Sequence, residues 1–167
     1  MPTTVRIPLA VLTVQPDSAN CFYVTKTGAS IDMAHLQYVD SGTGISTWWG
    51  TIPHNLAATP AWSLDIYHHA DSGSGGNVVL NVLARSSSNS QTIDIAPTLV
   101  SSAAVLATNT SNQWAYTAIS GGNFDGVVAV SSNNYLQVEI QRFGGHASDT
   151  VSAPWNLSAV LMRIDVA

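Results

Sequence analysis

Apolar and polar residues alternate along several short segments of this chain, as they do in β-strands with one buried face. In residues 135–143, Leu136, Val138 and Ile140 share one face, and the polar residues between them share the other. The dominant period is therefore two, which is the period of a strand. The same alternation predicts further strands at residues 5–11, 34–39, 47–52, 62–69 and 157–166.

One segment, residues 78–85, carries apolar residues on both faces. Val79 and Leu83 lie on the same side as the polar Asn81 and Arg85, opposite the regular apolar set. A strand of this kind is either central in a covered sheet or covered by another subunit. Both explanations are open at this point.

The segments between the predicted strands are rich in Gly, Ser, Asn and Asp, and good helix formers other than Ala and Leu are scarce. We expect about seven to nine short strands, which indicates an all-β fold. The predicted architecture is a two-sheet antiparallel β-sandwich, jelly-roll-like, in one domain over residues 1–167. Residues 98–108 fit a strand, a helical turn or an ordered crossing.

The N-terminal segment, residues 1–20, is expected to form a strand or an arm that contacts neighbouring subunits. Its short apolar run is interrupted by Pro8, so we do not expect a signal peptide. No apolar run reaches 18 residues, so no membrane-spanning helix is expected.

Charged residues make up only 9% of the chain, against about 25% in an ordinary soluble domain. Lys26 is the single lysine and Glu139 the single glutamate. A polar surface with so few charges repels its own copies poorly, which favours self-association. The net charge of −5 and the isolated arginines argue against a nucleic-acid partner.

The adjacent histidines, His68 and His69, are the first candidates for chemistry. On a strand they point to opposite faces, and only His69 shares a side with Asp65 or Asp71. Zinc needs three or four convergent ligands, so we expect no metal site. We expect one buried, hydrogen-bonded imidazole and one solvated imidazole.

Other catalytic patterns are missing from the sequence. Ser74 stands in Gly73–Gly76 without the spacing of a nucleophile elbow, and Cys21 is expected to be an inert core residue. A glycoside hydrolase would need a carboxylate pair. Most acids here stand beside Ser, Thr or Gly in turns, where Asp commonly caps the backbone. We therefore predict no enzyme activity and no cofactor. The turn acids are Asp17, Asp40, Asp71, Asp125 and Asp149.

Two adjacent tryptophans, Trp48 and Trp49, must point to opposite sides if they lie on a strand. The outward one is a candidate for an interface, for a sugar platform, or for packing under a loop. The candidate interface residues are Trp48, Trp49, Tyr67, Val79 and Leu83.

The C-terminal half resembles the small jelly-roll virion proteins of tailed bacteriophages. A strand that ends in Arg142 runs into a turn with Asp149 and Thr150, and an amphipathic strand then closes the chain. The similarity covers roughly residues 46–166, including the segments around Trp48 and Trp62. It implies a homotrimeric capsid decoration (cement) protein, or the related knob of a head or tail fibre, without catalytic residues.

Three functions follow as hypotheses. The first is a decoration protein on the capsid surface of the virion, made in the bacterial cytoplasm, that binds itself and the major capsid protein or another virion protein. The second is a carbohydrate- or receptor-binding β-sandwich of a phage fibre, which would use exposed aromatic rings and polar side chains. The third is a polysaccharide hydrolase, which lacks an identifiable carboxylate pair.

Overall fold

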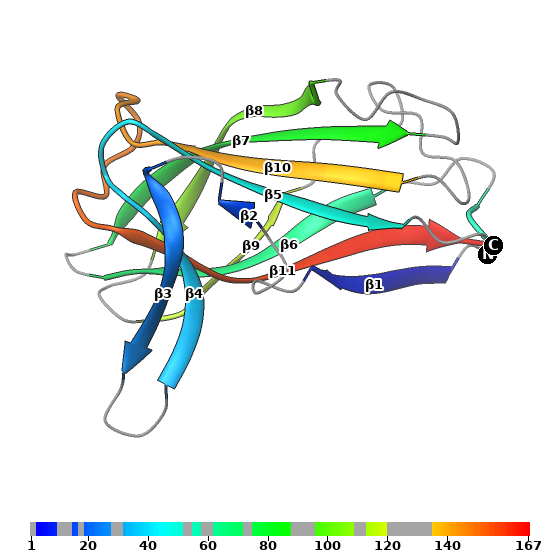
Figure 1. Ribbon diagram of the computed structural model, residues 1–167, viewed down its shortest axis with the longest axis horizontal. Coiled ribbons are helices and arrows are strands. Elements are labelled where there is room, and N and C mark those ends of the chain that lie inside the picture. The colour runs from blue at the N-terminus through cyan, green and yellow to red at the C-terminus, as the bar shows by residue number, and fades with distance from the viewer. Residues whose placement is uncertain are drawn as a thin grey trace.

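A computed structural model describes most of the chain, and all regular structure within its described residues is β-strand (Figure 1). Those residues contain no helix long and apolar enough to span a membrane. The described residues are 3–9, 15–16, 19–27, 32–51, 55–57, 62–71, 75–87, 96–108, 113–119 and 135–167.

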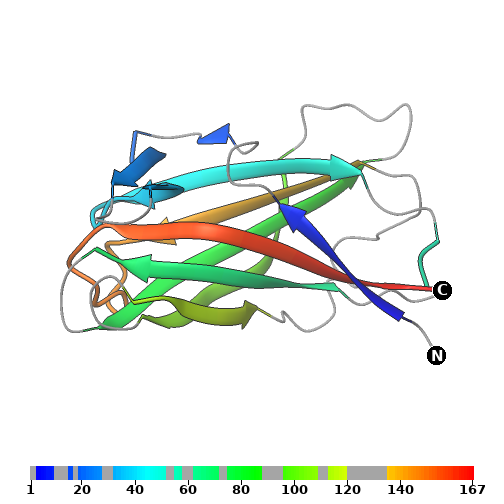
Figure 2. The same ribbon diagram turned by 90° about the horizontal axis from the view of Figure 1, so that it is seen from below.

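The strands form two antiparallel sheets that pack as two layers (Figures 1 and 2). Sheet A has the order β3-β4-β11-β6-β9, with β1 also paired to β11. Its strands are β1 (Thr3–Leu9), β3 (Cys21–Thr27), β4 (Asp32–Tyr38), β6 (Trp62–Ala70), β9 (Ala115–Ile119) and β11 (Trp155–Val166).

Sheet B has the order β2-β5-β10-β7-β8. From β4 onward the chain alternates between the layers, except that β7 and β8 are neighbours in one sheet, which is jelly-roll connectivity. The predicted fold class is therefore confirmed. The strands of sheet B are β2 (Gln15–Pro16), β5 (Thr43–Thr51), β7 (Gly76–Ser87), β8 (Thr98–Thr108) and β10 (Tyr135–Phe143).

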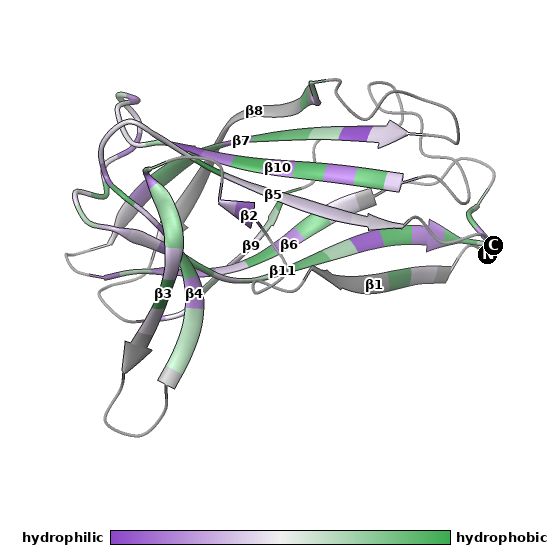
Figure 3. Cartoon of the chain, in the orientation of Figure 1, coloured by the Kyte–Doolittle hydropathy of each residue, from purple (hydrophilic) through white to green (hydrophobic). Residues whose placement is uncertain are grey.

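The core lies between the layers and is built from the alternating apolar residues that predicted the strands. Leu136, Val138 and Ile140 of β10 are buried there, while the residues between them face outward. Green and purple bands alternate along β10 in Figure 3 for this reason. Cys21, the single cysteine of the chain, is buried in the same core, as expected.

The predicted strands are present in the structure, which also contains strands that the sequence did not predict. The undecided segment 98–108 is β8, and three strands, β2, β3 and β9, were not among the predicted ones. The segment considered as an arm is, over Thr3–Leu9, a strand paired with β11 of the same chain. One edge of β1 is thus paired within the protomer.

The two-faced strand β7 is covered at one end by its own chain. Val79 is 1% exposed although it faces away from the core, and its backbone N–H donates to Asp149 Oδ2 at 3.1 Å. Asn77 pairs in the same way with Thr150, whose hydroxyl accepts the Asn77 N–H at 2.9 Å. The β10–β11 connection therefore packs over the start of β7. Leu83, farther along, is only half-buried.

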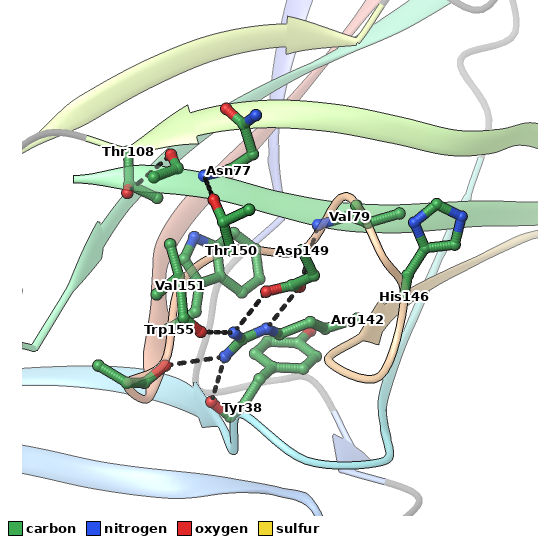
Figure 4. A network of polar contacts seen from close by, with 12 residues as sticks. Tyr38, Asn77, Val79, Thr108, Arg142, His146, Asp149, Thr150, Val151 and Trp155 are labelled. Atoms are coloured by element: carbon green, nitrogen blue, oxygen red, sulfur yellow. Dashed lines mark hydrogen bonds and ion pairs between the residues drawn. The ribbon is translucent and has the colours of Figure 1, made fainter.

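Arg142, the last inward residue of β10, holds this connection in place (Figure 4). Its Nε and one terminal nitrogen bind both carboxylate oxygens of Asp149, at 3.1 and 3.0 Å. Both side chains are almost completely buried, with 0% and 1% exposure. Asp149 accepts a backbone N–H, as a turn-capping acid does, and it is in addition the buried ion-pair partner of Arg142, which the sequence did not predict. The two residues are seven positions apart in the chain, and no pattern in the sequence predicted that they are in contact.

The guanidinium of Arg142 also satisfies backbone carbonyls that would otherwise be buried without donors. One terminal nitrogen donates to the carbonyl oxygens of Tyr38, Val39 and Ala153, and the other donates to Val151. These groups belong to the end of β4 and to the β10–β11 connection. A single side chain therefore joins both sheets, because β4 lies in sheet A and β10 in sheet B.

Glycine is required where this connection meets the β4–β5 turn. A Cβ on Gly144 would lie 2.3 Å from the carbonyl oxygen of Asp40, which is closer than any real contact. Gly42 in the turn has a φ of +77°, a conformation that side chains disfavour, and its carbonyl accepts the Gly144 N–H at 3.0 Å. The predicted turn clusters thus include positions where backbones touch.

Arg142→Met should lower the free energy of unfolding by about 3–5 kcal/mol, since it leaves the Asp149 carboxylate and several carbonyls buried without donors. Arg85→Met, on the partly exposed face of β7, is the control and should change it by less than about 1 kcal/mol. Urea unfolding followed by tryptophan fluorescence measures both. Equal small losses in the two variants would show that the Arg142 network contributes little to stability.

Candidate functional site

The structure distributes the five candidate interface residues over the core and two separate surfaces. Trp48 points into the core and is 2% exposed, and Val79 is covered by the β10–β11 connection. Neither can reach a partner, which corrects the sequence interpretation of both. Trp49 and Leu83 lie on the outer face of sheet B, whereas Tyr67 lies on the outer face of sheet A.

The outer face of sheet B gathers an exposed indole and polar side chains from three adjacent strands. Trp49 of β5 is 41% exposed and lies opposite Gln137 of β10, which in turn lies opposite Arg85 of β7. Directly opposed side chains in an antiparallel sheet have Cβ atoms about 5 Å apart. Ring, amide and guanidinium therefore form one row across the sheet.

Two further polar residues continue this surface along β10. Gln141 donates through Nε2 to Glu139 Oε1, so the single glutamate of the chain is oriented by a neighbour two residues away. Asn81 of β7 lies opposite Gln141. Trp49, Arg85, Gln137, Glu139 and Gln141, together with Asn81, Leu83 and Tyr135, are called the Trp49 face below.

Tyr135 closes the other end of this face. It is 46% exposed and lies one row from Trp49, between Thr51 and Ser87. Partial burial raises the pKa of its phenol above the usual 10. The hydroxyl is protonated at neutral pH, as any tyrosine hydroxyl is, and can donate a hydrogen bond. From Tyr135 to Gln141 the face extends about 20 Å along the strand.

The Trp49 face has the chemical character of a site for a neutral, hydroxyl-rich ligand. The indole offers a flat apolar surface, while amide, carboxylate and guanidinium groups beside it offer both donors and acceptors. Arg85 and Glu139 carry opposite charges, so the face has no strong preference for an ion of either sign. Aromatic stacking with flanking polar groups is how proteins fix small polar ligands.

Sequence reasoning found the indole of this face but not its partners. The residues Gln137, Glu139 and Gln141 were visible as the polar side of one strand. Their position beside Trp49 depends on the pairing of β10 with β5, which joins residues about 90 positions apart in the chain. The alternation shows which residues face outward, but the pairing decides which of them are neighbours.

The adjacent histidines face opposite sides, as predicted, but both are buried. His68 points into the core, where its Nδ1 accepts the Trp155 indole N–H at 3.0 Å and its Nε2 lies 3.1 Å from the Thr117 hydroxyl. His69 faces outward yet is only 6% exposed, because it packs against the rings of His35 and Trp114. The expectation of a solvated imidazole was therefore wrong.

These histidines do not assemble a metal centre in the described part of the chain. His69 Nε2 lies 3.9 Å from Asp71 Oδ1. No group of three or more His, Cys, Asp or Glu side chains among the described residues could hold a metal ion. His54 and several acids, including Asp17 and Asp125, lie outside the described residues.

No protein-family model and no curated protein sequence matches this chain, so its resemblance to phage virion proteins stays a prediction. Solved structures do match. A family 35 carbohydrate-binding module from Clostridium thermocellum aligns with a TM-score of 0.58 and 11% identity over 95% of this chain and 97% of that one. A CBM35 from Paenibacillus barcinonensis aligns with a TM-score of 0.53 and 13% identity, over 96% and 97% of the two chains.

An enzyme structure contains the same fold as one part. The isomalto-dextranase of Arthrobacter globiformis T6, complexed with panose, matches with a TM-score of 0.55 and 14% identity over 95% of this chain. This chain spans only 23% of that protein's length. At such low identities the similarity shows the fold alone. A structure of infectious bursal disease virus also matches, but its TM-score of 0.46 supports no argument.

Acid should destabilise the protein through His68. Burial, with a smaller contribution from neighbouring His69, lowers the His68 pKa from 6.5 to about 4. Between these two values the unfolded chain binds a proton that the folded chain excludes, so the free energy of unfolding falls as the pH falls. The loss by pH 4 is up to about 3 kcal/mol.

Urea unfolding at several pH values between 7 and 4 measures this dependence. Between pH 6.5 and 4, the free energy of unfolding of His68→Gln should fall less steeply with falling pH than that of the wild type. His146→Gln, at an exposed position, should keep the wild-type dependence. An unchanged slope in His68→Gln would assign the acid sensitivity to other groups.

Proposed function

We propose that this chain is a non-catalytic carbohydrate-binding module that holds a glycan against the Trp49 face. The observation that carries the proposal is the row of Trp49, Gln137 and Arg85 across three strands, with Glu139 beside it. The fold supports it, because the solved structures cited above with full-length overlap are carbohydrate-binding modules. Low sequence identity means that the proposal depends on this chain's own residues.

In the proposed complex, one sugar ring stacks on the Trp49 indole and its hydroxyl groups bond to the polar neighbours. Gln137 can donate and accept, Arg85 donates, and the Glu139 carboxylate accepts. The Gln141 contact holds that carboxylate in one orientation before the glycan arrives, which lowers the entropic cost of binding. Each such bond contributes about 0.5–1.5 kcal/mol, so we expect modest affinity.

The length of the Trp49 face favours a chain of sugars over a single one. Tyr135 and Gln141 lie about 20 Å apart along β10, and Trp49 lies between these ends. The face follows the surface of the sheet, so a polysaccharide can continue past it in both directions. As a phage-fibre module, the protein would use this surface on a glycan of the host cell.

A homotrimeric capsid decoration protein is the second candidate, and the weakly charged surface favours it. Only 9% of residues are charged, and Trp49, Leu83 and Leu99 lie on one face, with Leu99 opposite Leu83 and 44% exposed. Such a face could bury apolar area against another copy or a capsid protein. The N-terminal strand pairs along one edge with β11 of its own chain, so an arm contact with a neighbouring subunit would involve its other edge or its faces.

The first test is binding to soluble xylan and dextran in affinity gels, extended by a glycan array. Trp49→Ala should weaken binding about 30-fold, because loss of a central aromatic contact typically costs about 2 kcal/mol. Phe22→Ala is the matched control, because Phe22 is 40% exposed and lies on the other sheet. Retention of the wild-type affinity in Trp49→Ala, or no binding to any glycan, would contradict the proposal.

The second candidate is tested by the mass of the protein in solution. Size-exclusion chromatography with light scattering should give about three times the 17.5 kDa of one chain if it is a trimer. Leu83→Asp should then dissociate it, since a carboxylate at the buried centre of an interface is strongly unfavourable. A stable monomer at high concentration would count against the decoration role and leave the glycan proposal intact.

A further inference from the structure

The outer face of sheet A carries a second group of exposed aromatic rings, on the opposite side of the sandwich from the Trp49 face (Figure 1). Trp114 is 47% exposed and Tyr116 is 54% exposed, and the two are two residues apart at edge strand β9. Residues at this spacing point to the same side of a strand, about 7 Å apart. The two rings thus lie side by side on one surface.

Both rings contact side chains of the neighbouring strand β6. The Trp114 ring contacts His69, with centroids 5.2 Å apart, and the Tyr116 ring contacts Tyr67 at 5.3 Å. The Tyr116 hydroxyl donates to Asp65 Oδ1 at 2.9 Å, and Arg163 binds the same oxygen at 2.9 Å. Rings fixed in this way lose little freedom when a ligand stacks on them.

A hydrogen-bonded polar network continues from these rings across the sheet. Asn156 donates to Asp71 Oδ1 at 2.7 Å, and Gln37 donates to Asp71 Oδ2 at 2.8 Å and to Asn156 Oδ1 at 3.1 Å. Asn156 lies opposite His69, and the His69 ring contacts Trp114. The Asp71 side chain remains 26% exposed, so its carboxylate is accessible from solvent.

The chemistry of this surface fits a neutral sugar better than a protein partner. Asp65 and Arg163 neutralise each other, and the exposed apolar area at β9 consists of two rings bordered by polar groups. A stable protein interface buries about 800 Å² on each partner around an apolar centre. Two pre-oriented rings beside a carboxylate instead match a short stretch of a glycan.

We propose that Trp114, Tyr116 and the adjoining Asp71 form a second saccharide-binding surface, which makes the protein bivalent. This inference rests on the proposed carbohydrate-binding function. The two surfaces belong to different sheets and face away from each other, so one molecule can hold two polysaccharide chains at once. Bivalent binding raises the effective concentration of the second chain and joins separate chains.

The test counts binding sites per chain by isothermal titration with xylohexaose and with panose. The wild-type protein should bind two oligosaccharides per chain, and Trp114→Ala and Trp49→Ala should each bind one. The double variant should bind none. Tyr23→Ala removes an equally exposed ring from the opposite side of β3, away from Gln37 and Asp71, and it should keep both sites. Thermal unfolding confirms that each variant is folded.

The outcomes separate this inference from the proposed function. One site per chain in the wild type, lost in Trp49→Ala and unchanged in Trp114→Ala, would overturn the second surface and leave the first. A change in oligomeric mass on Trp114→Ala without a change in sugar binding would assign the Trp114 surface to a protein contact. Absence of binding to both oligosaccharides and to the glycan array would overturn both proposals.

Discussion

The buried pair of Arg142 and Asp149 is the interaction on which the rest of the structure most depends. A guanidinium in the core is costly unless every N–H finds an acceptor, and here a carboxylate and four backbone carbonyls supply them. Because these acceptors come from the end of β4 and the β10–β11 connection, the network fixes where β10 lies. Gln137, Glu139 and Gln141 stand on that strand, so the same constraint positions the Trp49 face.

The surface of the protein carries few charges and instead presents aromatic and amide side chains. Exposed rings such as Trp49 and Trp114 offer flat apolar surfaces to a ligand or to another protein. Glycans suit such rings, because their C–H faces are weakly polar while their hydroxyls need donors and acceptors. The same surface chemistry also suits association between protein copies. The glycan-binding proposal and the decoration-protein candidate therefore differ in whether a sugar or another protein covers the rings.

Strand alternation accounts for both the success and the failure of the residue assignments. Alternation required one of Trp48 and Trp49 to face the core. Only the pairing of Trp48 with Val138, a core residue of β10, shows which of the two it is. Val79 faces outward as the pattern indicates, yet Asp149 and its neighbours cover it. The polar partners of Trp49, and the contacts of His69 and Asp71 with the Trp114 surface, come from strands distant in the chain, so no local pattern could group them.

The sequence by itself determined the all-β class, most strand positions and which residues of each strand share a face, because alternation and turn composition are local properties. It could not decide the order of strands, since pairing depends on contacts between segments far apart in the chain. The tertiary structure alone placed Arg142 beside Asp149, buried His69 under Trp114, and brought Gln137 and Arg85 to Trp49. The contacts of His69 and Trp49 are neighbour relations between strands, and the Arg142 contact joins β10 to the connection that follows it. The alternation of residues along one strand contains neither kind of relation.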